Sequence, residues 1–128
     1  MSYSVGLSSI LVVDDDPIAA EALRYTLTTC GYDVTVAGDG IEALDYVRTG
    51  NYRIVISDVE MPKMNGIEFV REAKSKHKDA AYFILTGFDF NADIEEAIEE
   101  GLIIKYFTKP FDQNLIRSYI EEFVSALS

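Results

Sequence analysis

Short apolar runs without helical periodicity divide the chain at regular intervals. Runs of this length, rich in β-branched or aromatic residues, favour strands that are buried on both faces, as in a parallel sheet. Four runs fit this description, at residues 10–13, 54–56, 82–85 and 103–107. A weaker run at residues 33–36 predicts a fifth strand.

Amphipathic stretches lie between these runs, and their ends are recognisable. Asp16 is a suitable N-cap, Pro17 suits the first helical turn, and Gly31 ends this first helix. A second helix opens at Asp39 or Gly40, and the others are expected at residues 65–76, at residues 92–100 and from residue 112 onward. The order is therefore βα repeated five times, which predicts an α/β fold with a parallel sheet, helices on both of its faces and right-handed crossovers.

Length and composition fit one globular domain. The 128 residues are 48% hydrophobic, which is enough for a sizeable core, and we expect a single domain over residues 1–128 with a polar lead-in at 1–8. No apolar run approaches the roughly 18 to 20 residues that span a bilayer, and the N-terminus lacks the pattern of a secretory signal. The single cysteine, Cys30, favours a cytoplasmic location.

The charge balance excludes some partners. Eleven basic and 22 acidic residues give a formal net charge of −11, and no basic patch interrupts this acidic character. Such a field repels nucleic acid and anionic membrane surfaces. It suits basic proteins and divalent cations, although many soluble domains are acidic without such a role.

Polar side chains follow the predicted strands at the end where ligands bind in open α/β sheets. Asp14 and Asp15 follow the first strand, and Asp58 follows the third. Thr86 follows the fourth strand, and Lys109 comes after the fifth. We therefore expect these carboxylates, one hydroxyl and one ammonium to lie along one edge of the sheet.

Electrostatics then narrows the chemistry. Two carboxylates about 4 Å apart repel by roughly 4 kcal/mol at an effective dielectric near 20. If Asp14, Asp15 and Asp58 converge, the cluster needs a cation or must take up protons. Mg²⁺ binds one or two carboxylates together with a phosphate, and Lys109 would add positive charge. The combination indicates phosphoryl transfer to a carboxylate nucleophile.

The sequence resembles a receiver domain of the two-component response regulators from Ile10 to about Leu127. Any one of the motifs is weak alone, but four in order, each after its own strand, are highly specific. They are Val12-Val13-Asp14-Asp15, Ser57-Asp58-Val59-Glu60-Met61-Pro62-Lys63-Met64-Asn65-Gly66, Thr86-Gly87 and Lys109-Pro110-Phe111. The resemblance implies a doubly wound, flavodoxin-like (βα)5 fold with strand order 2-1-3-4-5.

The resemblance also implies the role of each site residue. Asp58 would be the phosphoacceptor, with Lys109 and Thr86 contacting the phosphoryl oxygens. Mg²⁺ would be held by Asp58, by Asp15 directly, by Asp14 partly through water and by the backbone carbonyl of Glu60. Tyr106 matches an aromatic residue that changes position together with Thr86 on phosphorylation. The peptide bond between Lys109 and Pro110 is cis in the family.

The implied partners are proteins. A sensor histidine kinase or a phosphotransfer protein would donate the phosphoryl group, and a small phosphodonor could replace it. The face formed by the fourth helix, the fifth strand and the fifth helix would signal to a downstream protein or to an output domain missing from this chain. Dimerisation through that face stays open. Such a domain is not an enzyme, since it catalyses only its own phosphorylation and dephosphorylation.

Two other functions share this architecture. A haloacid-dehalogenase-like, Mg²⁺-dependent phosphatase would need a hydroxyl or valine where Ile18 stands, and it would leave Asp58 without a role. A flavodoxin-like electron carrier would need a Ser/Thr-rich phosphate loop after the first strand, which the sequence lacks.

Overall fold

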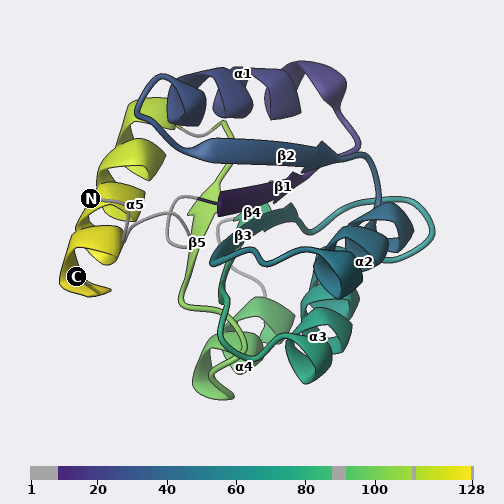
Figure 1. The fold of residues 1–128 in the computed structure, drawn as a ribbon. Helices are drawn as coiled ribbons and strands as arrows, with labels where there is room; N and C mark the ends of the chain where they lie inside the picture. The colour runs from purple at the N-terminus through teal and green to yellow at the C-terminus, as the bar shows by residue number, and fades with distance from the viewer. Residues whose placement is uncertain (1–8, 88–91, 111, 128) are drawn as a thin grey trace.

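The computed structural model describes residues 9–87, 92–110 and 112–127, so the predicted lead-in at 1–8 lies outside the described residues. Strands and helices alternate from end to end, as predicted (Figure 1). None of the described helices has both the length and the apolar composition that crossing a membrane requires. The elements are β1 (Ser9–Val13), α1 (Pro17–Thr28), β2 (Asp33–Ala37), α2 (Gly40–Thr49), β3 (Ile54–Asp58), α3 (Gly66–Lys76), β4 (Ala81–Thr86), α4 (Ala92–Glu99), β5 (Lys105–Thr108) and α5 (Gln113–Leu127).

The strands form one parallel sheet in the order β2-β1-β3-β4-β5, which confirms the predicted topology. The order reverses at β1, because β2 lies on one side of it and β3 on the other. The three apolar runs in the middle of the sheet, β1, β3 and β4, are almost fully buried, as expected for strands covered on both faces. The carboxyl ends of β1 and β3 are therefore neighbours at the point where ligands bind in such sheets.

Helices cover both faces of the sheet (Figure 1). On one face, α1 and α5 pack over a core that includes Leu23, Leu27, Ile116 and Ile120. On the other face, α2, α3 and α4 cover a second core that includes Phe69. Because each face is covered by its own apolar cluster, the central strands β1 and β3 are held firmly together, and the carboxylates that follow them have little freedom to move apart.

Side-chain caps begin four of the described helices, and at α5 the side chain of Asp112 accepts a hydrogen bond from the backbone N–H of Asn114. Asp16 accepts a hydrogen bond from the backbone N–H of Ile18, which confirms the predicted cap of α1, and Pro17 occupies the first turn. Asp39 caps α2 in the same way. Asn65 forms a capping box with Glu68 at the start of α3.

The fifth strand differs from its prediction. It begins at Lys105 rather than at residue 103, because the backbone N–H of Ile103 turns back to the carbonyl of Ala97 and helps to end α4. Gly101 permits this reversal with a φ of +80°. The strand is also only partly buried, since it forms an edge of the sheet, and Lys105 and Tyr106 keep some contact with solvent.

Candidate functional site

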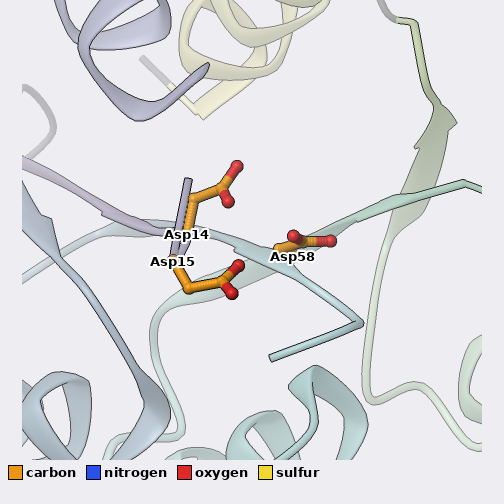
Figure 2. A group of neighbouring side chains, drawn as sticks. All are labelled: Asp14, Asp15 and Asp58. Atoms are coloured by element: carbon orange, nitrogen blue, oxygen red, sulfur yellow. The ribbon is translucent and has the colours of Figure 1, made fainter. Parts of the chain in front are cut away.

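Three carboxylates meet where β1 and β3 end. Val13 and Ser57 are paired in the sheet, so the residues that follow them, Asp14 and Asp58, emerge side by side. One carboxylate oxygen from each of Asp14, Asp15 and Asp58 lies within 4.8 Å of the others. Figure 2 shows Asp14 and Asp15 reaching from consecutive positions after β1 toward Asp58. Asp14 and Asp58 are buried, whereas Asp15 is exposed.

The ammonium of Lys109 completes this cluster. Its Nζ lies 2.9 Å from Oδ2 of Asp58 and 3.9 Å from Oδ2 of Asp14. The backbone holds the lysine in place, because its N–H donates to the carbonyl of Thr86 over 2.6 Å. The following bond to Pro110 is cis, as predicted. One cation thus faces three carboxylates, which leaves the site with excess negative charge.

Burial and the excess of negative charge both affect the pKa of Asp14. Burial raises the pKa of Asp14 to about 6, and the negative charge of Asp58 raises it as well, against the lowering effect of a hydrogen bond from the backbone N–H of Asp16 and the charge of Lys109. That hydrogen bond reaches Oδ1 at 2.9 Å. The other oxygen, Oδ2, is buried and accepts no hydrogen bond from the described residues.

The pKa of Lys109 responds to the same cluster. Burial by itself lowers the pKa of this ammonium, but the hydrogen bond to Asp58 and the charges of Asp58, Asp14 and Asp15 together raise it above its ordinary value. Lys109 is therefore firmly protonated at neutral pH. A group in this state attracts anionic oxygens and does not act as a base.

The loop after Asp58 is built against the backbone of that residue. The N–H of Glu60 points toward Oδ1 of Asp58 at 3.4 Å, and the hydroxyl of Ser57 donates to the Asp58 carbonyl at 2.9 Å. Gly66 approaches so closely that a Cβ there would lie 2.1 Å from the Asp58 carbonyl oxygen. The sequence suggests only a turn residue at Gly66, because nothing in it reveals that the start of α3 packs on the backbone of the third strand.

The two predicted switch residues lie on neighbouring strands. Thr86 is fully buried at the end of β4 and pairs with Thr108 at the end of β5. Tyr106 pairs with Ile84 two positions earlier and packs, half-buried, against the core under α2, α3 and α4. Thr86 thus lies between Tyr106 and the carboxylate cluster along the sheet.

The donor set suits a hard divalent cation. Carboxylate oxygens from Asp14, Asp15 and Asp58 are close enough to share one ion, and the buried Oδ2 of Asp14 has no hydrogen-bond donor among the described residues. Mg²⁺ prefers oxygen ligands of this kind and keeps several waters, which the exposed side of Asp15 leaves room for. A cation there would also offset the repulsion from Asp58, which adds to the effect of burial in raising the pKa of Asp14.

Comparison with known proteins gives a consistent result. Residues 10–121 match the response regulator receiver domain family. The chain is 38% identical over 102 residues to the response regulator MprA of Mycobacterium sp. (strain KMS), a match that covers 80% of this chain and 44% of that protein. The chain thus spans less than half the length of this relative.

Solved structures of receiver proteins have the same fold. Chemotaxis response regulator CheY4 of Vibrio cholerae superimposes with a TM-score of 0.81 at 30% identity, covering 90% of this chain and 97% of that one. Response regulator TrrA of Thermotoga maritima, solved in complex with Mg²⁺-BeF, gives a TM-score of 0.78 at 33% identity with the same coverage.

Proposed function

Because the chain belongs to the response regulator receiver domain family and is a phosphorelay receiver, we propose that Asp58 is the residue that accepts its phosphoryl group. The main support for this proposal is the position of the buried Asp58 carboxylate. Its Oδ2 lies 2.9 Å from the ammonium of Lys109, and one of its oxygens lies within 4.8 Å of carboxylate oxygens of Asp14 and Asp15. A haloacid-dehalogenase-like phosphatase is not favoured, since the family match is to receivers.

Asp14, Asp15 and Asp58 would hold Mg²⁺, with the backbone carbonyl of Glu60 as a fourth protein ligand. The ion supplies charge neutralisation for the carboxylates and for the incoming phosphoryl oxygens. Two observations support this assignment: no described residue donates a hydrogen bond to Oδ2 of Asp14, and the cluster holds more carboxylates than ammonium groups.

The chain's own residues would divide the work of the transfer. An oxygen of Asp58 attacks the phosphorus of a phosphohistidine, or of a small acyl phosphate, so that an O–P bond forms while the bond to the donor breaks and the donor leaves with the electron pair. Lys109 binds a phosphoryl oxygen through its ammonium, and the Thr86 hydroxyl contacts another. The close packing of Gly66 on the Asp58 backbone keeps the nucleophile in place.

Phosphorylation would then shift the balance between two conformations. The phosphoryl group adds about −1.5 to −2 charge and three acceptor oxygens. Thr86 and Lys109 are joined through their backbones, so their movement toward those oxygens would shift the ends of β4 and β5 together. Tyr106 would follow on β5 and change the face formed by α4, β5 and α5. Charge-assisted contacts of about 1.5–3 kcal/mol each suffice for such a population shift.

The partners follow from this role. The donor would be a sensor histidine kinase or a phosphotransfer protein, and the receiver of the signal a downstream protein or an output domain outside this chain. The relative MprA is more than twice the length of the matched stretch, which supports an output domain. The domain would turn over no external phosphoester beyond its own phosphorylation and dephosphorylation.

Intact mass measurement after incubation with acetyl phosphate and Mg²⁺ tests the proposal. We expect the wild-type chain to gain one phosphoryl group and the Asp58→Asn variant to gain none. Asp16→Asn is the matched control, because Asp16 is an exposed neighbour whose capping role asparagine can fill. Phosphorylation of Asp58→Asn at the wild-type rate would refute the assignment.

A further inference from the structure

The loop between β3 and α3 contains a strained turn at Lys63. Among the described residues other than glycine, only Lys63 has a positive φ, at 74°. The N–H of Met64 donates to the carbonyl of Pro62 over 2.8 Å, so a single residue lies between donor and acceptor. A bond across one residue with this φ forms a γ-turn of the rare, strained class, which a residue with a Cβ adopts only when its surroundings hold it there.

Two contacts with the start of α2 hold this turn. The ammonium of Lys63 lies 3.5 Å from Oδ2 of Asp39. Asp39 is itself fixed, because its other oxygen, Oδ1, accepts the N–H of Glu42 and caps α2. The side chain of Met64 lies against Gly40, where an added Cβ would come within 3.2 Å of it. The tip of the loop is therefore attached to α2, and the ion pair reaches the strained residue itself.

The base of the same loop is attached at the end of β3. Gly66 donates its N–H to the carbonyl of Val59 over 2.8 Å and packs on the backbone of Asp58. Glu60, whose carbonyl is the fourth protein ligand proposed for Mg²⁺, lies between this base and the tip at Lys63. Because the base is fixed, the orientation of the Glu60 peptide depends on where the tip is held.

We propose that the ion pair between Lys63 and Asp39 positions the Glu60 carbonyl for Mg²⁺. The inference deepens the proposed function and rests on it, since it concerns the same metal site. Neither Lys63 nor Asp39 belongs to the carboxylate cluster that would bind the ion. Both are therefore positioning residues, and each acts on the metal site through the loop.

Charge alone would give the two residues opposite effects on Mg²⁺ binding. Removal of the Lys63 cation would strengthen the attraction of a divalent cation to the acidic site, and removal of the Asp39 anion would weaken it. Positioning gives both changes the same sign, because either one breaks the ion pair. The two substitutions together therefore separate a positioning role from a long-range electrostatic one.

Lys63→Gly and Asp39→Asn test the proposal on the full chain. Glycine adopts a positive φ without strain, and asparagine keeps the cap of α2, so we expect both variants to fold. The Mg²⁺ affinity of each chain follows from the rise of its urea midpoint across a MgCl₂ series at constant ionic strength. We expect each variant to bind Mg²⁺ roughly two- to fivefold more weakly, as for loss of a largely exposed ion pair. The double variant should bind no more weakly than either single variant, because the same pair is lost.

Two further measurements distinguish positioning from a loss of stability. In EDTA, Lys63→Gly should have a urea midpoint no lower than that of the wild type, since strain is relieved as the ion pair is lost. With acetyl phosphate, followed by intact mass, both variants should need more Mg²⁺ for half-maximal phosphorylation but should reach the wild-type rate at saturating Mg²⁺.

A second ion pair provides matched controls. Lys76 and Glu72, toward the far end of α3, are also 3.5 Å apart and are exposed. Lys76→Gly and Glu72→Gln make the same changes in charge away from the loop. Both should leave the affinity for Mg²⁺ unchanged.

Several outcomes would overturn the proposal. These are shifts of opposite sign for Lys63→Gly and Asp39→Asn, unchanged affinity in both, and an equal loss in the control variants. A wild-type urea midpoint that does not respond to MgCl₂ would refute the metal assignment and this inference with it. If the variants bind Mg²⁺ as expected but the wild-type chain gains no phosphoryl group, only the proposed phosphoryl transfer fails.

Discussion

Neutralising Asp14 should stabilise the metal-free fold. The side chain is buried beside Asp58 and Lys109, and burial raises its pKa from 3.8 to about 6. A carboxyl group whose pKa is higher in the folded state than in the unfolded state binds its proton more tightly when folded. The wild-type fold therefore loses stability as the pH rises from about 4 to about 6, and above that range the loss is complete.

The size of the effect follows from the same values. At about 1.36 kcal/mol per pKa unit, the rise from 3.8 to about 6 corresponds to an upper bound of about 3 kcal/mol. Asp14→Asn removes the charge but keeps an oxygen that can accept the N–H of Asp16. We expect the variant to be about 1–3 kcal/mol more stable than the wild type above pH 6, and nearly equal to it below pH 4.

Urea unfolding in EDTA across pH 4–8, followed by circular dichroism, measures this difference in the free energy of unfolding. Asp16→Asn, an exposed neighbour, is the control and should show no such pH-dependent gain. Repeating the series with Mg²⁺ should stabilise the wild type more than the Asp14→Asn variant, because the variant lacks one carboxylate ligand. A variant that is no more stable than the wild type at pH 7.5 in EDTA would refute the electrostatic reasoning.

Three further predictions concern the residues around the acceptor. Gly66→Ala should destabilise the fold by about 1–3 kcal/mol or more and should slow phosphorylation, because its Cβ would overlap the Asp58 carbonyl. Gly38→Ala is the control in the same unfolding and mass assays, because a Cβ there would meet only a glutamate side chain at 3.5 Å. Lys109→Gln should leave the fold about 1–3 kcal/mol less stable at pH 7 by urea unfolding, since Asp58 loses its charged partner at 2.9 Å; an unchanged midpoint would contradict this. Thr86→Ala should still gain a phosphoryl group by intact mass but should lose the phosphorylation-dependent change in the fluorescence of Tyr106; a full wild-type response would disprove the proposed relay.

The apolar pattern was sufficient for most of the fold. The residues of β1, β3 and β4 have no helical periodicity and are buried on both faces, so their sequence reports directly on their surroundings. The fifth strand was less predictable, because Ile103 is as apolar as the strand that follows it but serves to end α4. An apolar run indicates burial and cannot distinguish a strand from the buried turn before it.

The candidate site, too, was predictable from the sequence only in part. The order of motifs at the strand ends was enough to expect Asp14, Asp15, Asp58 and Lys109 at one edge, since parallel strands bring their carboxyl ends together. The contact between Gly66 and the backbone of Asp58 was not predictable, because it depends on how α3 packs after a loop.

Stability and phosphorylation should therefore respond in opposite directions to changes in the carboxylate cluster. Burial raises the pKa of Asp14 and the excess of negative charge raises it further, so both destabilise the metal-free fold, and the apolar cores on both faces of the sheet hold the carboxylates together in spite of this. That same excess provides the ligands for a cation and, through it, a place for phosphoryl oxygens. A substitution such as Asp14→Asn relieves the repulsion and removes a ligand at once, so it should give a more stable chain that is phosphorylated more slowly. If stability and phosphorylation rate instead fell together, Asp14 would act through packing, and the electrostatic account of the site would fail.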